Sequence, residues 1–275
     1  MERHGISVAV YAVLALATLI LGLPFYWMCI TSLKPVEEVL VFPPGWWPET
    51  FRWANYVDAW QAAPFGWFYV NSLVTGIAAT AMQVGFALLM AYAFVWIPFP
   101  AKRALFIAVL ATMMIPEEMK LAPNYLLLAR LGWRDTYWAL IIPPAAHAFP
   151  VFVLYQQFRM LPKDLLEAAR IDGAGHLRTL LQIVLPVSRP LVIAVTLIAF
   201  LGRWNDFLWP LIVTDRLIMR TLPIGLAYLR DVETGSHQWN LLMAGSVFVV
   251  APILVVYAYA QRYFVEGLTQ GALKG

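Results

Sequence analysis

Long apolar segments alternate with shorter polar segments along this 275-residue chain. Several apolar segments reach the roughly 20 residues that an α-helix needs to cross a lipid bilayer. This pattern predicts an all-α, polytopic membrane protein with six transmembrane helices in a single domain, residues 1–275. The predicted spans are residues 6–33, 67–96, 104–122, 137–159, 191–214 and 240–263.

The third predicted span is the least regular of the six. Residues 104–115 supply only about half of the required apolar length, so we expect the helix to continue through Pro116, Glu117, Glu118 and Lys120. These charges would then lie at the outer mouth of the span. They fit either an interfacial charge cluster or the surface of a transport pathway.

The polar segments set the topology. The predicted outer loops are residues 34–66, 123–136 and 215–239, and residues 161–190 form a polar segment on the other side. The side that carries both termini and residues 161–190 has slightly more Lys and Arg, and fewer acids, than the other side. The positive-inside rule therefore predicts cytoplasmic termini.

Composition supports a membrane protein. Hydrophobic residues make up 61% of the chain and charged residues 13%, and the mean hydropathy is +0.70. A soluble domain carries roughly 25% charged residues. The net charge of +3 does not indicate nucleic-acid binding, because the basic residues are scattered between spans. The single cysteine, Cys29, lies in the first apolar segment, which excludes a disulfide framework and a thiolate metal site.

Residues 161–190 are polar yet strongly patterned. Pro162 and Asp164 are typical of a helix start and Gly173 of the position just past a helix end, so we expect a helix of about ten residues. One face should carry Leu165, Ala168, Ala169 and Asp172. After Gly175 we expect a second helix, with the stripe Leu177, Leu180, Leu181 and Val184, which Pro186 ends or kinks. Such a helix pair fits either a lipid-surface helix or a protein docking surface.

The fifth predicted span contains the most costly polar residues. Arg203 and Asp206 can neutralise each other at spacing i, i+3, which is a purely structural role. Asn205 and Trp209 would share a face at i, i+4, and an indole ring beside an amide suits a sugar. The candidate substrate path comprises Asn205, Asp206, Trp209, Glu117 and Met114.

Other polar residues in the spans favour packing roles. Asn71 and Gln83 are expected to join helices. His147, between Pro144 and Pro150, lacks a second ligand at helical spacing, so we expect a hydrogen-bonded role and no metal site. The chain has no GxxxxGK[ST] phosphate loop and no catalytic constellation, so it is not predicted to be an enzyme.

Several short sequence motifs add a family resemblance to the prediction of a membrane protein. Glu167-Ala168-Ala169, Gly173, Ile183 and Leu185-Pro186 resemble the EAA loop of the membrane subunits of bacterial ABC importers. WNDFLWPLIVTD, TLPIGL, QWNLLMAG, the ending RYFVEGLTQGALKG and MIPEEMKLAPNYLLLARLGWRDTYWALIIP resemble the carbohydrate-uptake branch, the maltose-type second permease subunit. The strings PEEMKLAP and WNDFLWPL also resemble the glycerol-3-phosphate subgroup.

The resemblance implies a multi-pass permease in a bacterial or archaeal cytoplasmic membrane. Its implied partners are a second, homologous permease, two ATPase subunits that bind ATP and Mg²⁺, an extracytoplasmic solute-binding protein, and lipid. The chain itself would bind no cofactor, and the tail, residues 267–275, would approach the ATPase dimer. Residues 215–239 would reach the binding protein. The residues implied in ATPase coupling are Glu167, Ala168, Ala169, Asp172, Gly173, Ile183, Leu185 and Pro186.

Two alternatives stay open, the first from the resemblance and the second from the residues. Within the same architecture, the cargo could be glycerol-3-phosphate or its diesters instead of a carbohydrate. In another class, an ion-coupled secondary transporter would explain Arg203 and Asp206 inside a span, although no inverted repeat is visible.

Overall fold

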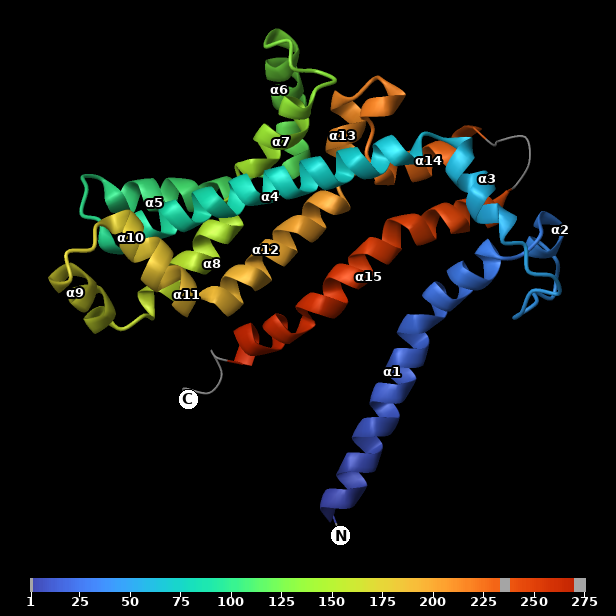
Figure 1. Cartoon of the computed structure of the whole chain (residues 1–275), viewed down its shortest axis with the longest axis horizontal. Coiled ribbons are helices and arrows are strands. Elements are labelled where there is room, and N and C mark those ends of the chain that lie inside the picture. Colours follow the sequence, from blue (N-terminus) through green and yellow to red (C-terminus); the bar gives the residue numbers. More distant parts are fainter. Residues whose placement is uncertain (1, 233–237, 270–275) are drawn as a thin grey trace. The chain divides into compact units, whose positions relative to one another are not determined.

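A computed structural model describes residues 2–232 and 238–269, and every regular element in these residues is a helix (Figure 1). This confirms the all-α prediction for the described part of the chain. The chain divides into two compact units. The first combines residues 1–65 with 225–252, and the second combines residues 66–224 with 253–275.

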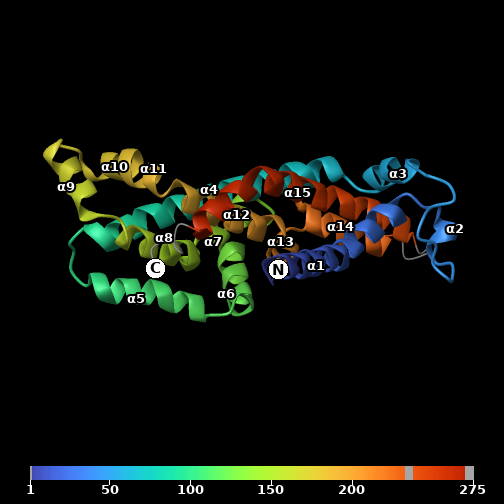
Figure 2. The same ribbon diagram turned by 90° about the horizontal axis from the view of Figure 1, so that it is seen from below.

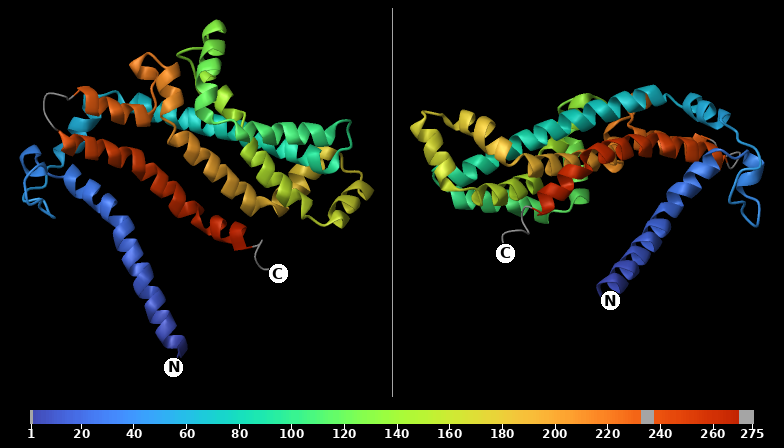
Figure 3. Two further views of the ribbon diagram at one scale, coloured as in Figure 1. Left: turned by 180° about the vertical axis from the view of Figure 1, so that it is seen from behind. Right: turned by 60° about the horizontal axis from the view of Figure 1, so that its bottom comes forward.

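The first unit begins with α1, Glu2–Ser32, one helix that continues through Pro24. Two short helices follow, α2 (Val36–Val39) and α3 (Ala54–Ala62), and Figure 3 shows α2 beside the end of α1. The unit also contains most of α14 (Leu222–Val232) and the first half of α15 (Trp239–Thr269). Its core joins α3 to α15 through Ala59, Leu241, Ala244, Tyr56 and Phe248.

The second unit is built around α4, Phe65–Trp96. Its further elements are α5 (Lys102–Ala111), η1 (Thr112–Met114), α6 (Glu117–Arg130), α7 (Tyr137–Ala145), α8 (Ala148–Arg159), α9 (Lys163–Ile171), α10 (His176–Thr179), η2 (Leu180–Val184), α11 (Leu185–Val187), α12 (Arg189–Trp204), α13 (Leu208–Val213) and η3 (Leu217–Met219). The largest core cluster joins the last turns of α4 to α8 and η2 through Ala87, Ala91, Leu154, Phe158 and Val184.

Among the described residues, three helices are long and apolar enough to cross a membrane by themselves. They are Val8–Ser32, Phe65–Trp96 and Trp239–Tyr259. The number rises to five at most if two bent pairs each count as one span. These pairs are Tyr137–Ala145 with Ala148–Arg159, bent by 41°, and His176–Val187 with Arg189–Trp204, bent by 88°.

The predicted third span is not one helix. The α-helix ends at Ala111, a single 3₁₀ turn follows, and Ile115 and Pro116 are extended, with ψ of 114° and 142°. A proline disfavours helical geometry at the residue before it, so Pro116 separates α5 from α6. The prediction of a helix that continues through Pro116 and Glu117 was therefore wrong. The two glutamates instead occupy the first turn of α6, where the helix dipole favours negative charge.

The predicted fifth span is also broken. The helix α12 ends at Trp204, and α13 begins only at Leu208. Pro210 lacks a backbone N–H, and in a continuous helix its ring would meet the carbonyl of Asp206. The expectation that Asn205 and Trp209 share one helical face was consequently wrong.

The last two predicted segments contain further helices. Residues 215–239, predicted to be an outer loop, include η3 and α14 in the described part of the chain. The sixth predicted span, residues 240–263, lies in one helix that continues through Gly245 and Pro252. Gly245 is required by close packing, because a Cβ atom there would lie 2.7 Å from Leu229 Cδ1.

Candidate functional site

The segment expected to dock a partner is a helical hairpin, α9 to α11, here called the hairpin. In Figures 1 and 2 it lies at the end of α4 that connects to α5. Gly173 ends α9 with a φ of +72°, as the sequence predicted. The amide of Gly173 donates to Arg170 O at 3.1 Å, and the amide of Ala174 donates to Ala169 O at 2.9 Å. This is the hydrogen-bond pattern of a Schellman C-cap, in which the left-handed residue reverses the chain.

The second half of the hairpin is anchored to the body of its unit. Leu180 and Val184 are 2% and 1% exposed and belong to the core cluster with α4 and α8. The imidazole Nδ1 of His176 lies 3.1 Å from the hydroxyl of Tyr92 on α4. A movement of α10 or η2 must therefore displace α4 and α8 as well.

Three of the four residues on the predicted apolar face of α9, Leu165, Ala168 and Asp172, are exposed, and the fourth, Ala169, is buried. Leu166 is buried within the chain as well. Ile171 is 87% exposed, although it lies in a helix that ends in a well-formed cap. Leu165, Ala168 and Ile171 follow one another at spacing i, i+3, i+6 and so form a continuous exposed apolar row along α9. Of the eight predicted coupling residues, those exposed in the chain are Glu167, Ala168, Asp172, Gly173 and Pro186, Ala169 is buried, and Ile183 and Leu185 are half-buried.

The second site is a cavity of about 690 Å³ in the second unit. It lies among the start of α6, the end of α7 and the break between α12 and α13. Four of the five predicted substrate-path residues line it, namely Glu117, Asn205, Asp206 and Trp209. Met114 does not line the cavity and is 84% exposed.

One ion pair and one hydrogen-bonded contact organise the polar wall of the cavity. Arg203 Nη1 lies 3.1 Å from Asp206 Oδ2, and both side chains are largely buried, at 16% and 20% exposure. The mutual neutralisation predicted for this pair is therefore present. His147 Nε2 lies 3.0 Å from Glu117 Oε1, and His147 Nδ1 accepts a hydrogen bond from the amide of Phe149. The expected hydrogen-bonded role of His147 is confirmed by these contacts.

The role expected for Trp209 changes. Its indole is 7% exposed and packs with Leu128, Leu140 and Val213, and its Nε1 donates to Ala139 O at 2.9 Å. Because its N–H is hydrogen-bonded and most of its ring is buried, Trp209 holds α13 against α7 and offers little ring surface on which a sugar could stack.

Trp133 is the aromatic residue that sequence reasoning missed. It is half-buried, lines the cavity and follows Gly132, whose φ of +67° turns the chain after α6. Its ring centroid is 6.4 Å from that of Trp138, which is 59% exposed and does not line the cavity. The sequence signal that could have identified Trp133 is its position directly after Gly132, within the predicted outer loop of residues 123–136.

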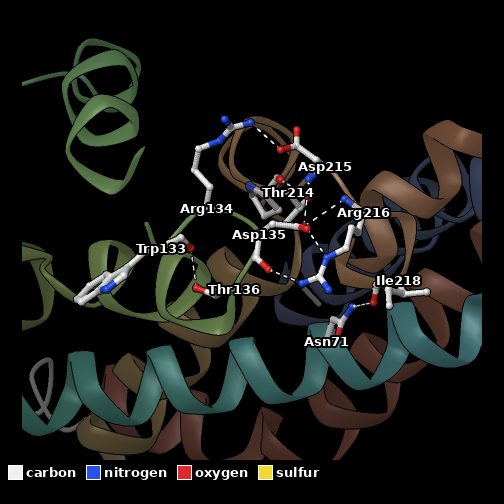
Figure 4. A network of polar contacts seen from close by, with 10 residues as sticks. Asn71, Trp133, Arg134, Asp135, Thr136, Thr214, Asp215, Arg216 and Ile218 are labelled. Carbon is white, nitrogen blue, oxygen red and sulfur yellow. Dashed lines mark hydrogen bonds and ion pairs between the residues drawn. The ribbon is translucent and has the colours of Figure 1, made fainter. Parts of the chain in front are cut away.

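A polar clasp beside the cavity joins the α6–α7 connection to the start of the 215–221 segment (Figure 4). Asp135, with a φ of +58°, accepts the amides of Asp215 and Arg216 at 3.1 and 3.2 Å and pairs with the guanidinium of Arg216. Its own amide donates to Val213 O at 2.8 Å. Asn71 on α4 donates to Ile218 O at 2.7 Å, so the segment is also fixed to α4, as expected for Asn71.

The clasp lowers the pKa of Asp135. Burial alone would raise that pKa, but the hydrogen bonds and charge of Arg216 and the amide of Asp215 outweigh it. A carboxyl whose pKa is lower in the folded state stabilises the fold above its unfolded pKa, which is 3.8 here. That contribution is lost as the pH falls from this value through the lower, folded pKa.

Replacing Asp135 with asparagine should therefore destabilise the protein in a pH-dependent way. Asparagine tolerates positive φ and keeps an acceptor for both amides, but it loses the charge-assisted bond to Arg216. We expect a loss of about 1–1.5 kcal/mol, because the Asp135 side chain is 16% exposed but that of Arg216 is 61% exposed. The thermal unfolding midpoints of wild type and Asp135→Asn should differ by a constant amount at neutral pH and converge below about pH 4.

The control is the neighbouring, more exposed pair of Arg134 and Asp215, whose side chains are 38% and 65% exposed. Arg134→Gln should shift the midpoint little, because exposed ion pairs contribute at most about 1 kcal/mol. Equal shifts of the unfolding midpoint in both variants would contradict the stabilising role of Asp135. A shift in Asp135→Asn that does not change with pH would contradict it as well.

Comparisons with known proteins place this geometry in a family. Residues 83–270 match the family described as "Binding-protein-dependent transport system inner membrane component". This match covers well over half of the chain. The chain belongs to this family. The matched region includes both the hairpin and the cavity, and it is consistent with a location in a bacterial inner membrane.

Curated relatives agree with the family over nearly the whole chain. UgpE, the sn-glycerol-3-phosphate transport system permease protein of Yersinia pestis bv. Antiqua (strain Antiqua), is 33% identical over 273 residues and 97% of each chain. AraQ, the arabinooligosaccharides transport system permease protein of Bacillus subtilis (strain 168), is 33% identical over 284 residues and all of both chains. These members of the family are transport permeases and not enzymes.

A solved structure supports the permease fold. A chain of a bacterial ABC transporter involved in the import of the acidic polysaccharide alginate matches with a TM-score of 0.81. The alignment covers 96% of this chain and 98% of the other, at 20% identity. Within residues 2–232 and 238–269, no group of three or more His, Cys, Asp or Glu side chains could hold a metal ion.

Proposed function

We propose that this chain is the membrane-spanning permease subunit of an ATP-driven importer for a carbohydrate that an extracytoplasmic binding protein delivers. The observation that carries the proposal is the hairpin. Its capped helix α9 exposes Leu165, Ala168 and Ile171, while its second half is fixed in the core against α4 and α8. An exposed apolar contact on a rigidly anchored element is suited to transmit a partner's movement.

The proposed assembly rests on the family resemblance. This chain has no phosphate-binding loop of its own. Two partner ATPase subunits would bind ATP and Mg²⁺ and contact Glu167, Ala168, Asp172 and Gly173. A second, homologous permease would complete the pathway. The tail that we expect near the ATPase dimer, residues 267–275, lies largely outside the described residues, as do residues 233–237 of the segment expected to reach the binding protein.

The proposed topology has six crossings with both termini and the hairpin in the cytoplasm. Three single helices and one bent pair, α7 with α8, supply four of the crossings. The apolar helix α12, which turns by 88° from the hairpin, supplies a fifth. The sixth begins with α5 and η1, which by themselves are shorter than the roughly 20 residues that a crossing needs. The hairpin itself would lie along the cytoplasmic membrane surface.

In the proposed mechanism, closure of the ATPase dimer moves the hairpin as one body. Because α11 leads directly into α12, this movement is passed to the break at Asn205 and Asp206 on the wall of the cavity. The cavity then opens alternately toward the two sides. Its volume of about 690 Å³ is within the range of small-ligand sites.

The lining of the cavity favours an uncharged sugar over a phosphate ester. Its charged side chains are the acids Glu117, Glu118 and Asp206 and the bases Lys120 and Arg203. Arg203 is already paired with Asp206, so only Lys120 stays available for an anionic cargo. Trp133 offers an aromatic surface of the kind that packs on the C–H face of a pyranose. The glycerol-3-phosphate alternative, which the likeness to UgpE supports, would require a phosphate site elsewhere.

The test is uptake of labelled arabino-oligosaccharide and of glycerol-3-phosphate by membrane vesicles that contain the whole transporter. We expect sugar uptake that requires ATP and survives ionophores. Trp133→Ala should reduce the apparent affinity about fivefold, because an aromatic contact contributes about 1 kcal/mol.

The matched control is Trp138→Ala, which removes the neighbouring tryptophan outside the cavity and should leave uptake unchanged. Uptake that persists without ATP but collapses with the ion gradient would indicate a secondary transporter instead. Uptake of glycerol-3-phosphate alone would refute the assignment to carbohydrate.

A further inference from the structure

The loop of residues 38–49 in the first unit has an unusual distribution of polarity. Its ten central residues, 39–48 (VLVFPPGWWP), contain no charged side chain. Leu40, Val41, Phe42, Trp46 and Trp47 are 53–92% exposed. We call this set the aromatic tip. A soluble surface rarely keeps so many contiguous large apolar side chains in water.

Within residues 38–49, the charged side chains are those of Glu38 and Glu49, at the two ends of the loop, which we call its neck. The amide of Glu49 donates to the carboxylate of Glu38 at 3.1 Å, which ties the two ends of the uncharged stretch together. Further along the chain, Arg52 and Asp58 form an exposed ion pair with atoms 3.5 Å apart. The loop thus has a polar base and an apolar tip.

The tip is folded back along α1 instead of pointing away from it. Tyr26 donates its hydroxyl hydrogen to Trp46 O at 2.6 Å, and the rings of Trp27 and Trp46 meet edge to face at 5.8 Å. The buried amine of Lys34 donates to Gly45 O and lies 5.1 Å from the centre of the Trp27 ring. These contacts fix the tip against the last turns of α1.

The depth of these contacts follows from helix geometry. Tyr26 lies six residues before Ser32, the end of α1, so at 1.5 Å per residue it is ~9 Å below that end. The apolar segment Val8–Ser32 is long enough to cross a membrane, and its side chains from Val8 to Phe25 are exposed within this chain. A loop held at the level of Tyr26 therefore reaches the depth of the lipid headgroups and the first acyl carbons.

We propose that the aromatic tip inserts into the membrane interface of the leaflet in which α1 ends, and that the occupant of this surface is lipid. Tryptophan rings favour this region because they combine a large apolar face with an N–H that can stay in contact with water. The uncharged stretch, the polar neck and the position beside the span all match this environment.

The test measures the environment of the tip in the assembled transporter. In a Cys29→Ala background, single cysteines at Leu40 or Trp47 carry a nitroxide label, and Glu49→Cys at the neck is the matched control. The complex is placed in nanodiscs of phosphatidylethanolamine and phosphatidylglycerol. Collision rates with oxygen, which partitions into lipid, and with a water-soluble nickel chelate are then recorded by electron paramagnetic resonance.

We expect the oxygen-to-nickel collision ratio to be severalfold higher at Leu40 and Trp47 than at Glu49, with or without the binding protein. Equal ratios at all three positions would show that the tip is in water. Low collision rates with both reagents, or a fall when the binding protein is added, would show a protein contact. Each of these results overturns the proposal. The readout needs neither ATP nor substrate, so its failure is distinct from a failure of the proposed transport function.

Discussion

Replacing Gly173 with valine should abolish most ATP-driven uptake without removing the transporter from the membrane. Gly173 has a φ of +72°, and no atom lies within 4 Å of the position that a Cβ would take. The substitution is therefore costly because of backbone strain and not because of a clash. A left-handed conformation costs an L-residue about 1–2 kcal/mol, and a β-branched residue more.

The strain should be relieved by opening the C-cap of α9. Both capping bonds, from Gly173 to Arg170 O and from Ala174 to Ala169 O, depend on the left-handed residue. Without them the exposed contact at Ile171 would no longer be held at a fixed angle to the anchored half of the hairpin. Gly173→Asn is the control, because asparagine adopts positive φ far more readily and should retain most uptake. Uptake by vesicles, normalised to the amount of transporter on an immunoblot, gives the comparison.

Removing Asp206 alone should be the most destabilising single change at the cavity. Asp206→Ala leaves the guanidinium of Arg203 largely buried without its partner at 3.1 Å. Breaking a buried ion pair in this way costs about 3–5 kcal/mol. We expect the variant to unfold at a markedly lower temperature in detergent and to accumulate poorly in the membrane.

The double variant Arg203→Leu/Asp206→Leu separates charge from packing. Replacing both members of a buried pair with apolar groups is often close to neutral, so this protein should regain most of the lost stability. The measurement is the thermal unfolding midpoint of wild type, single and double variants. If the double variant were as unstable as the single one, the pair would matter for its shape or its hydrogen bonds and not for charge neutralisation.

Local signals in the sequence located the hairpin well. Gly173 was predicted to end α9 because glycine adopts the left-handed conformation at little cost, and the structure places it there. The pairing of Arg203 with Asp206 followed from the high cost of two buried charges at spacing i, i+3. Both predictions rest on interactions among residues close in sequence, which periodicity and residue type can reveal.

Features that depend on tertiary structure were not predictable in the same way. Apolar periodicity could not say which side of α9 packs on its own chain, and the structure shows that Leu166 and Ala169 do so. The breaks at Pro116 and before Pro210 were not predicted, although each site contains a proline. Continuous helices were expected there because a membrane span requires about 20 helical residues. Trp133 reaches the cavity only because Gly132 turns the chain after α6, which no helical pattern encodes.

The central claim is that the hairpin transmits a partner's ATP-driven closure to the spans. The most direct test is to measure ATP hydrolysis and sugar uptake in the same vesicles carrying Gly173→Val. We predict that hydrolysis continues while uptake per ATP falls to a small fraction of the wild-type ratio, and that Gly173→Asn keeps most of that ratio. A wild-type ratio of uptake to hydrolysis in Gly173→Val would contradict the claim.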